Sequence, residues 1–183
     1  VLAQFGIESA ALGFIGGFTG DQLERMLGNS LVKTDFVRVL GGNTRINVKL
    51  IEQQMTEINA GGPFVTEDEV KQLLEKTDAL KDGDTIVIAG SAPKNVSDDI
   101  YERILERLSD RKIKAVVDAT GKLLLKTLKY KPFLIKPNID ELGEMFGTKI
   151  SCESDILKYA SELRAMGAQN VLISMGKDGA ILF

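Results

Sequence analysis

The chain has 183 residues, a formal net charge of −3, 44% hydrophobic residues and 27% charged residues, which suits a soluble globular domain with a sizeable core. It contains no histidine and one cysteine, Cys152, so Ser-His, Cys-His and His-metal mechanisms and an internal disulfide are excluded. There is no basic block and no apolar run of about 18 residues, so we expect neither a nucleic-acid nor a membrane partner. A cytoplasmic location is the simplest expectation for a chain with one cysteine.

The first third of the chain predicts one strand, one helix and then three more strands. Residues 11–15 form a short apolar run, and residues 21–27 place apolar side chains on one helical face before Gly28. The three further strands are predicted at residues 36–40, 45–51 and 55–60. Because turn-length connections join them, we predict an antiparallel meander, since parallel strands need longer crossovers.

From residue 66 onward the sequence alternates between strands and helices. Thr66 and Glu69 form a capping-box pattern ahead of an apolar helical stripe. Strands are predicted at residues 85–89, 113–117, 133–135, 171–173 and 179–183. Helices are predicted from Ser97 onward, at residues 123–128 and 139–146, and along an apolar stripe at residues 156–163. The alternation indicates an α/β fold with a parallel sheet covered by helices and a small β flap at about residues 36–62.

Both ends of the chain resemble interrupted elements. Residues 1–5 have the pattern of a helix tail that ends at Gly6, and Phe183 lies inside an apolar strand. We therefore expect the chain to be a fragment of a longer fold.

Two polar segments follow predicted strands, where open α/β sheets bind their ligands. Residues 90–93 contain Ser91 and small residues that would let a ligand approach the backbone, but an ordinary βα loop has the same composition. Lys136 could offer a cation to phosphate, and Glu141 a carboxylate to hydrated Mg²⁺. Asn138 and Glu141 are equally the pattern of a plain capping box.

A third segment and a polar strand can likewise be interpreted either as ligand-binding or as ordinary structure. Residues 174–179 could hold nucleotide phosphate or ribose, or form a hairpin turn at Asp178 and Gly179. Arg45 and Asn47 share one face of an alternating strand, as in many half-exposed strands, but an arginine there could also clamp a phosphate.

The glycines near the start of the chain do not form a nucleotide-binding motif. Gly13, Gly16, Gly17 and Gly20 do not have the G-x-G-x-x-G spacing, and no G-x-x-x-x-G-K-[ST] motif occurs. Any kinase activity would therefore not be of the P-loop type.

Taken together, the segments resemble the ribokinase-like (phosphofructokinase B-type) family of sugar kinases, and most closely its 1-phosphofructokinase subgroup. The resemblance depends on order and spacing over nearly the whole chain, at residues 12–20, 44–50, 56–59, 90–93, 135–141 and 174–176. It implies a ribokinase-like three-layer α/β/α sandwich with a mostly parallel sheet and a small β-meander lid. Residues 1–183 would be an incomplete kinase domain, with the lid inserted at about residues 36–62 and often serving as the dimer contact.

The resemblance also implies roles for individual residues. Arg45 and Asn47 would lie on the lid side of the sugar-phosphate site, and Ser91 near the substrate and the phosphoryl group. The ATP-binding residues would be Lys136, Asn138, Ser174, Gly176, Lys177 and Gly179. Asn138 and Glu141 would form the family's N-x-x-E element, in which Glu141 acts on Mg²⁺ indirectly, through water.

The chain departs from the family's pattern in three ways. Ala92 stands where related kinases usually have leucine. An upstream substrate-binding aspartate and Gly-Gly-Lys stretch are missing, and so is the downstream Gly-Ala-Gly-Asp segment with the catalytic base. No catalytic residue is therefore assigned, and we expect the base beyond Phe183. Asp118 follows a different strand and is interpreted as a structural or nucleotide-side acid.

The implied reaction is ATP-dependent phosphorylation of fructose 1-phosphate at its 6-hydroxyl, which gives fructose 1,6-bisphosphate. ATP and Mg²⁺ are the implied cofactors, a sugar phosphate the implied small-molecule partner, and a homodimer formed through the lid the implied assembly. Two alternatives remain open. One is a related sugar kinase, such as a tagatose-6-phosphate kinase, and the other is a non-catalytic nucleotide- or sugar-phosphate-binding role for the fragment alone.

Overall fold

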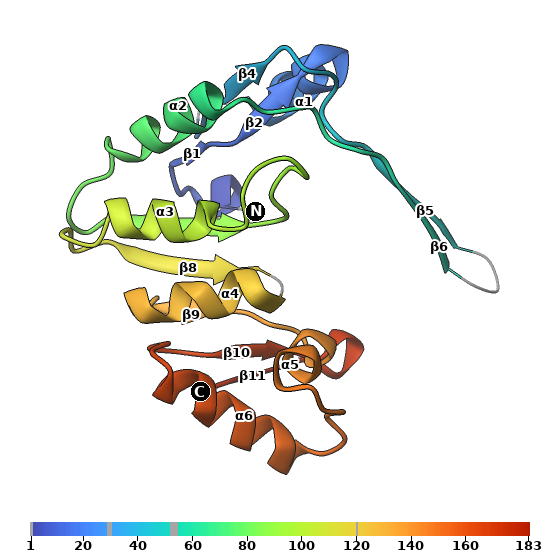
Figure 1. Ribbon diagram of the computed structural model, residues 1–183, viewed down its shortest axis with the longest axis vertical. Helices are drawn as coiled ribbons and strands as arrows, with labels where there is room; N and C mark the ends of the chain where they lie inside the picture. Colours follow the sequence, from blue (N-terminus) through green and yellow to red (C-terminus); the bar gives the residue numbers. More distant parts are fainter. Residues whose placement is uncertain (1, 29–30, 52–54, 120) are drawn as a thin grey trace. The chain divides into compact units, whose positions relative to one another are not determined.

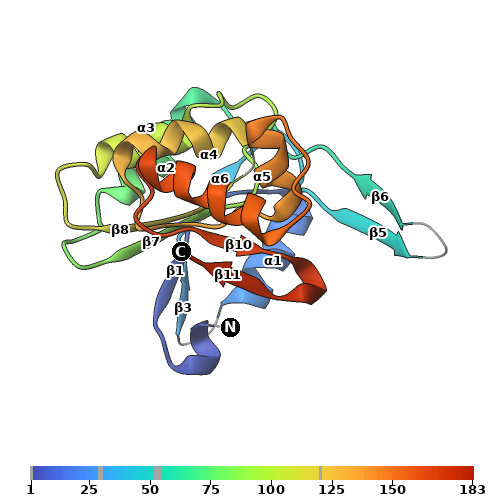
Figure 2. The same cartoon turned by 90° about the horizontal axis from the view of Figure 1, so that it is seen from below.

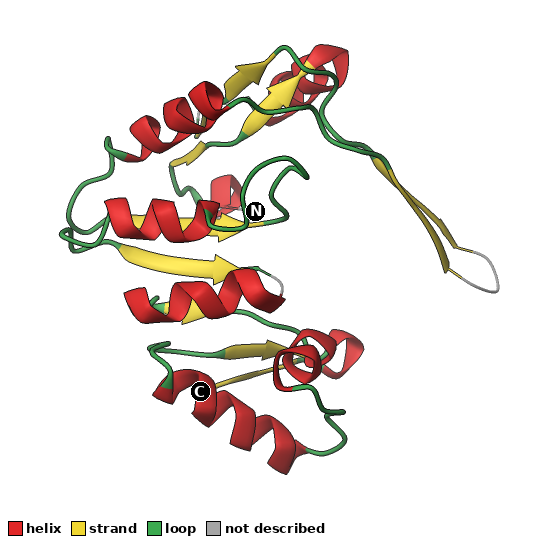
Figure 3. Ribbon diagram, in the orientation of Figure 1, coloured by secondary structure: helices red, strands yellow, loops and turns green. Residues whose placement is uncertain are grey.

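The computed structural model describes residues 2–28, 31–51, 55–119 and 121–183, which divide into two units. Unit 1 comprises residues 1–76 and 93–97, and unit 2 comprises residues 77–92 and 98–183. Figure 1 labels most of the strands and α-helices along the chain, and Figure 3 distinguishes helices from strands and loops. Each unit combines strands with helices and is described separately below.

Unit 1 contains six strands and two α-helices among its described residues. In chain order these are 3₁₀-helix η1 (Leu2–Phe5), β1 (Ser9–Ala11), β2 (Phe14–Gly16), α1 (Gly17–Leu27), β3 (Val32–Thr34), β4 (Val37–Val39), β5 (Asn47–Ile51), β6 (Met55–Asn59) and α2 (Glu67–Thr77). Strand β1 pairs in parallel with β3, and β2 in parallel with β4. Helix α2 begins with the predicted capping box, because Thr66 Oγ1 accepts from the Glu69 amide and Glu69 Oε2 accepts from the Thr66 amide.

The predicted three-stranded meander is wrong in its first strand. Strand β4 pairs with β2, not with β5, and Val37 and Val39 on β4 are both buried. The Val37 amide donates to the Gly13 carbonyl at 2.9 Å, which fixes the register of this parallel pair. The short spacing from residue 40 to residue 45 suggested a turn, but partners distant in the sequence decided the pairing. The turn predicted at residues 52–54 lies outside the described residues.

Strands β5 and β6 form a two-stranded antiparallel hairpin that extends away from the rest of unit 1 (Figure 1). Its cross-strand pairs include Val48 with Ile58 and Lys49 with Glu57. The Lys49 ammonium lies 2.8 Å from the Glu57 carboxylate, and its hydrogen bond holds the pKa of Glu57 below the usual value. Successive side chains of a strand point to opposite faces, so one face of the hairpin carries these charges. The other face exposes Val48, Leu50 and Ile58.

Unit 2 is built on a parallel sheet. Its elements are β7 (Thr85–Ala89), α3 (Ile100–Arg107), β8 (Lys114–Asp118), α4 (Gly121–Thr127), η2 (Leu128–Tyr130), β9 (Leu134–Ile135), α5 (Ile139–Phe146), α6 (Glu153–Ala165), β10 (Leu172–Ser174), η3 (Gly176–Asp178) and β11 (Ala180–Leu182). Strands β7, β8 and β9 pair in parallel in that order, and two parallel bridges continue the sheet from β9 to the antiparallel pair β10–β11. In Figure 2, α3, α4 and α6 lie along one side of these strands.

The predicted apolar stripes form the core of unit 2. Ile100, Tyr101, Ile104, Leu105 and Leu108 on and just after α3 are all buried. The predicted bounds of β7 and α5 match the structure, but α3 begins at Ile100 and not at Ser97. Asp99 precedes the first helical turn with φ −99° and ψ 0°, so the chain turns before the helix starts. Among the described residues, no helix is both long enough and apolar enough to cross a bilayer.

Candidate functional site

Three polar side chains of unit 2 lie at the ends of neighbouring strands of one sheet. Ser91 follows β7 after Gly90, Asp118 is the last residue of β8, and Lys136 follows β9 directly. The bridge between Asn138 and Ser174 extends this edge to β10. The carboxyl ends of parallel strands meet at one edge, which is where open α/β sheets bind ligands. The sheet therefore brings together the phosphate-side positions predicted from the sequence.

Lys136 and Asp118 form an ion pair at this edge. The Lys136 ammonium lies 3.0 Å from Asp118 Oδ1, with the two side chains 37% and 38% exposed. The Lys136 amide donates to the Val117 carbonyl at 3.0 Å, so the backbone also fixes where the lysine leaves the sheet. Solvent reaches both groups, so an incoming anion could compete with Asp118 for the ammonium. This pairing of Lys136 was not predicted, although Asp118 ends β8 and Lys136 directly follows the adjacent strand β9.

The capping-box interpretation of Asn138 and Glu141 is confirmed. Asn138 Oδ1 accepts from the Glu141 amide at 2.8 Å, and Glu141 Oε2 accepts from the Asn138 amide at 2.8 Å. Capping of α5 is thus sufficient to explain why asparagine and glutamate occur at these two positions. Within the described part of the chain, no group of three or more His, Cys, Asp or Glu residues is placed to hold a metal ion. The role of Glu141 toward Mg²⁺ therefore stays a prediction.

Glutamine at position 141 separates the two roles, because its amide oxygen can still accept from Asn138 while the negative charge is lost. If Glu141 acts on hydrated Mg²⁺, the Mg²⁺ concentration for half-maximal turnover should rise about tenfold in Glu141→Gln, as expected for a lost hydrogen bond to a charged group. In the longest product of the gene, titration with Mg²⁺ of the ATP-dependent turnover expected from the family resemblance measures this. Glu69→Gln makes the same change in the capping box of α2 and should leave the Mg²⁺ dependence unchanged. Equal Mg²⁺ curves for all three proteins would leave Glu141 with a capping role alone.

Residues 175–179 join β10 and β11 as a hairpin, but through a loop that contains 3₁₀-helix η3 (Gly176–Asp178) and is longer than the predicted turn at Asp178 and Gly179. The Met175 amide donates to the Gly179 carbonyl at 2.8 Å, and β10 and β11 pair on either side. Gly176 and Gly179 have φ values of +60° and +92°, so the turn itself calls for glycine at both positions. Lys177 is exposed at the tip, and the Ser174 amide donates to the Pro137 carbonyl at 3.1 Å. The nucleotide-binding role of this segment stays a prediction.

The turn after β7 has a partner that was not predicted from the sequence. The Tyr101 hydroxyl donates to the Gly90 carbonyl at 2.8 Å, next to Ser91. Burial raises the pKa of Tyr101, and the charge of Asp118 raises it further. In the sequence Tyr101 belongs to the apolar stripe of α3. Tyr101 is the one residue of this stripe with a hydroxyl group. Because a buried tyrosine usually needs a hydrogen-bond partner, the sequence could have indicated that its hydroxyl contacts a polar group.

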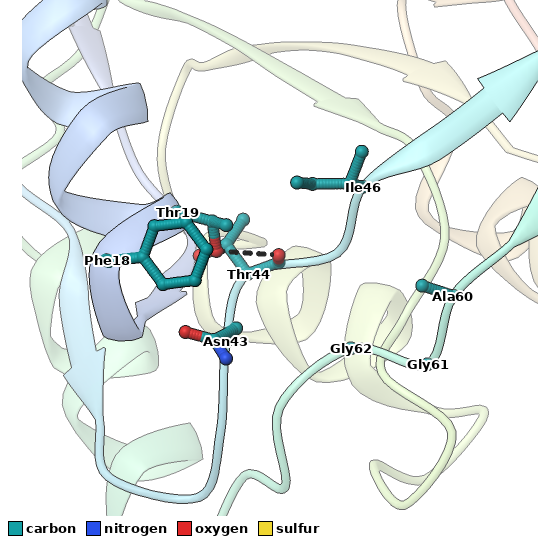
Figure 4. A pocket seen from close by; sticks show the side chains of 8 residues that line it. All are labelled: Phe18, Thr19, Asn43, Thr44, Ile46, Ala60, Gly61 and Gly62. Atoms are coloured by element: carbon teal, nitrogen blue, oxygen red, sulfur yellow. Dashed lines mark hydrogen bonds between the residues drawn. The ribbon is translucent and has the colours of Figure 1, made fainter.

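Unit 1 contains a pocket of about 330 Å³ at the base of the hairpin (Figure 4). Its lining residues are Phe18, Thr19, Asn43, Thr44, Ile46, Ala60, Gly61 and Gly62. Arg45 is exposed and lies between two of these residues in the sequence, and Asn47 begins β5 opposite Asn59. Arg45 and Asn47 thus adjoin lining residues in the sequence but do not line the pocket themselves, and its walls come from α1 and from the segments on either side of the β5–β6 hairpin.

The glycines at the start of α1 have a packing role. The Gly16 amide donates to Thr44 Oγ1 at 2.9 Å, and the Thr44 amide donates to the Gly16 carbonyl at 2.8 Å. A side chain at Gly17, which has a φ of +57°, would collide with Asn43. The same loop receives a hydrogen bond from Thr19 Oγ1 to the Thr44 carbonyl at 2.9 Å (Figure 4). These glycines let the loop before Arg45 lie directly against the helix.

Comparison with known proteins explains why these segments occur in this order. All residues from 1 to 183 match the profile of the pfkB family carbohydrate kinases. The chain belongs to this family. The resemblance inferred from the motif spacing is thus confirmed, and with it the ribokinase-like α/β fold class.

Relatives with curated names lie within the same family. The 1-phosphofructokinase of Bacillus subtilis (strain 168) is 43% identical over 183 residues, which are 100% of this chain and 60% of the relative. The D-tagatose-1-phosphate kinase of Bacillus licheniformis is 39% identical over 182 residues, covering 99% of this chain and 60% of that protein. The chain thus spans about 60% of the length of these pfkB relatives.

A solved pfkB-type structure has the same fold. Phosphofructokinase-2 from Escherichia coli, in complex with fructose-6-phosphate, matches with a TM-score of 0.88 at 26% identity, over 100% of this chain and 61% of that chain. These comparisons do not test the ligand-binding roles predicted for Arg45, Asn47, Ser91 and Lys136. Those roles therefore stay predictions.

Proposed function

We propose that the protein containing this chain transfers the γ-phosphoryl group of MgATP to the 6-hydroxyl of fructose 1-phosphate. The observation that carries the proposal is Lys136 at the carboxyl edge of the sheet, on the same edge as Ser91, in a chain of the pfkB family. The 43% identity to a 1-phosphofructokinase supports the substrate.

In this proposal the residues of the chain act by binding and by charge, as is usual in phosphoryl transfer. Lys136 leaves Asp118 and neutralises the ATP phosphates, assisted by the amides at the start of α5. Arg45 clamps the sugar phosphate with its two parallel N–H donors, and Asn47 adds an amide contact. Ser91 donates to the substrate or to the transferring phosphoryl group. The nucleotide is lined by Asn138, Ser174, Gly176, Lys177 and Gly179.

The start of α5 fits a hydrated Mg²⁺ ion. Glu141 uses one carboxylate oxygen to accept from Asn138, and a carboxylate has about four acceptor positions, so others remain for metal-bound water. When bound there, Mg²⁺ would supply positive charge that neutralises the ATP phosphates. None of the described residues is assigned as the base that takes the proton from the sugar hydroxyl, and we expect that base beyond Phe183.

The β5–β6 hairpin is the proposed lid and dimer contact. Its apolar face exposes Val48, Leu50 and Ile58 by 43%, 54% and 54%, more than side chains of this kind show when they face a core. Two copies of this face would cover each other and exclude water from the sugar. A monomeric mass in analytical ultracentrifugation at assay concentrations would contradict this part of the proposal. A cytoplasmic site of action, where ATP and sugar phosphates occur, belongs to the same proposal.

D-tagatose 1-phosphate is the second candidate substrate, because a relative of that name is 39% identical. Fructose and tagatose differ only in configuration at C4, so one arginine clamp on the C1 phosphate would serve both. Tagatose 6-phosphate, with its phosphate at the other end of the sugar, is not favoured.

A coupled ADP-release assay tests both activity and substrate. With the longest product of the gene, kcat/KM should be highest on fructose 1-phosphate, lower on tagatose 1-phosphate and lowest on tagatose 6-phosphate. A preference for either tagatose ester would overturn the substrate assignment. The 183-residue chain alone should show no turnover, and turnover equal to that of the longer product would contradict the placement of the base beyond Phe183. Nucleotide binding by the isolated chain, measured calorimetrically, would show that it retains a binding role.

A further inference from the structure

A hydrogen bond in unit 2 connects a helix to the turn that carries Ser91. Tyr101 lies in the first turn of α3, is 7% exposed, and donates its hydroxyl proton to the Gly90 carbonyl at 2.8 Å. The ring is anchored in the apolar stripe of α3, beside the buried Ile104 and Leu105. Packing of the ring in the core therefore holds the hydroxyl in a fixed position at the sheet edge.

The turn it contacts begins at the last paired residue of the strand. Ala89 is the final residue of β7 to pair with β8, opposite Asp118, and Gly90 then turns with a φ of +89°. Ser91 follows immediately and is exposed. The Gly90 carbonyl and the Ser91 amide belong to one planar peptide unit. A hydrogen bond that holds the carbonyl oxygen therefore also holds the orientation of the backbone at Ser91.

The phenol stays a donor over the whole physiological range. Burial, and secondarily the Asp118 charge, raise the pKa of Tyr101 above its ordinary value near 10. Asp118 pairs with Ala89, the residue before the Gly90 carbonyl that accepts from the phenol, and its Oδ1 contacts Lys136. The hydroxyl, Asp118 and Lys136 thus form neighbouring parts of one sheet edge, from β7 to β9.

We propose that Tyr101 is a positioning residue of the kinase, which holds the Gly90–Ser91 turn in the geometry that Ser91 needs for phosphoryl transfer. This inference rests on the proposed function and assigns a role to a residue that touches neither substrate. Small displacements of a contacting group are costly in transfer reactions, because the reacting atoms must stay aligned.

Tyr101→Phe is the sharpest test, since it removes only the hydroxyl and keeps the buried ring. In the longest product of the gene, kcat on the preferred sugar phosphate should fall about three- to tenfold, the range of one neutral hydrogen bond. The KM for ATP should not change, because Lys136 and α5 are untouched. Tyr159→Phe is the matched control: Tyr159 stacks on Phe146 with ring centroids 4.6 Å apart and should tolerate loss of its hydroxyl without a kinetic effect.

Hydrogen–deuterium exchange supplies a readout that does not depend on activity. The peptide covering residues 86–92 should exchange faster in Tyr101→Phe than in the parent and in Tyr159→Phe. Unchanged exchange in this peptide would overturn the proposal, and so would faster exchange with an unchanged kcat. A uniform loss of kcat and of thermal stability, with exchange raised throughout unit 2, would also overturn it, since it would indicate a structural role only. If the parent has no kinase activity on any of the sugar phosphates, the proposed function fails, and the catalytic role of Tyr101 fails with it. The exchange experiment would then still decide whether Tyr101 holds the turn.

Discussion

Replacing Lys136 by methionine should lower kcat/KM for MgATP about 100- to 1,000-fold, the range found when one stabilising donor is removed from a transition state. Methionine has a similar length but no charge. The substitution therefore removes a phosphate ligand and leaves Asp118, 3.0 Å from the ammonium in the native chain, as an unpaired negative group. Steady-state kinetics of the longest product of the gene, with varied MgATP at saturating sugar phosphate, measures the effect.

A double-mutant cycle separates the two causes of that loss. Asp118→Asn alone frees Lys136 from its partner, and Lys136→Met with Asp118→Asn removes both charges. If repulsion by Asp118 is a large part of the loss, the double variant should recover part of the activity that Lys136→Met lacks. Lys126→Met removes an exposed lysine from α4 and should have wild-type kinetics. Kinetics of Lys136→Met that match those of Lys126→Met would remove Lys136 from the proposed mechanism.

Replacing Arg45 by alanine should raise the KM for fructose 1-phosphate about 10- to 100-fold, as expected for hydrogen bonds from a charged group to phosphate. The KM for ATP should remain unchanged. The thermal midpoint should not shift, because Arg45 is exposed and exposed substitutions usually alter stability little. In the longest product of the gene, kinetics with varied fructose 1-phosphate at saturating MgATP give the KM for the sugar phosphate, and differential scanning calorimetry gives the thermal midpoint.

Two further variants make the arginine experiment specific. Arg45→Lys keeps the charge but loses the planar fork, so its KM should lie between those of the parent and Arg45→Ala. Arg25→Ala removes an exposed arginine from α1 in the same unit and should leave both KM values unchanged. If Arg45→Ala and Arg25→Ala behave alike, Arg45 does not bind the sugar phosphate.

Elements with strong local patterns could be predicted from the sequence, whereas pairings between distant segments could not. Strand β7 and helix α5 match their predicted bounds because a β-branched run and a capping box are local signals. The predicted meander gives β4 the wrong partner. Its pairing with β2 depends on Phe14 meeting Val37 across 23 positions, and no local pattern encodes that contact.

The same limit applies to the candidate site. The positions of Lys136 and Glu141 followed from their place after a strand, and the capping box at α5 was correctly read as one of two possibilities. The partners Asp118 and Tyr101 were not predicted, because each contact requires the order of strands in the sheet and the orientation of α3. The binding roles depend on ligands, and they stay predictions until the kinetic experiments are done.

The pairing of β5 with β6 constrains how this chain can evolve in length. From Asn47 opposite Asn59 to Leu50 opposite Thr56, each residue has one partner, and the two faces differ in charge and apolarity. One residue gained or lost within β5 would reverse the faces beyond it and would place Lys49 among the apolar side chains. Two residues gained or lost together would preserve both faces, and the same change in both strands would preserve the pairing as well and alter only the length of the hairpin. Homologous sequences should therefore differ in the lengths of β5 and β6 by even numbers of residues.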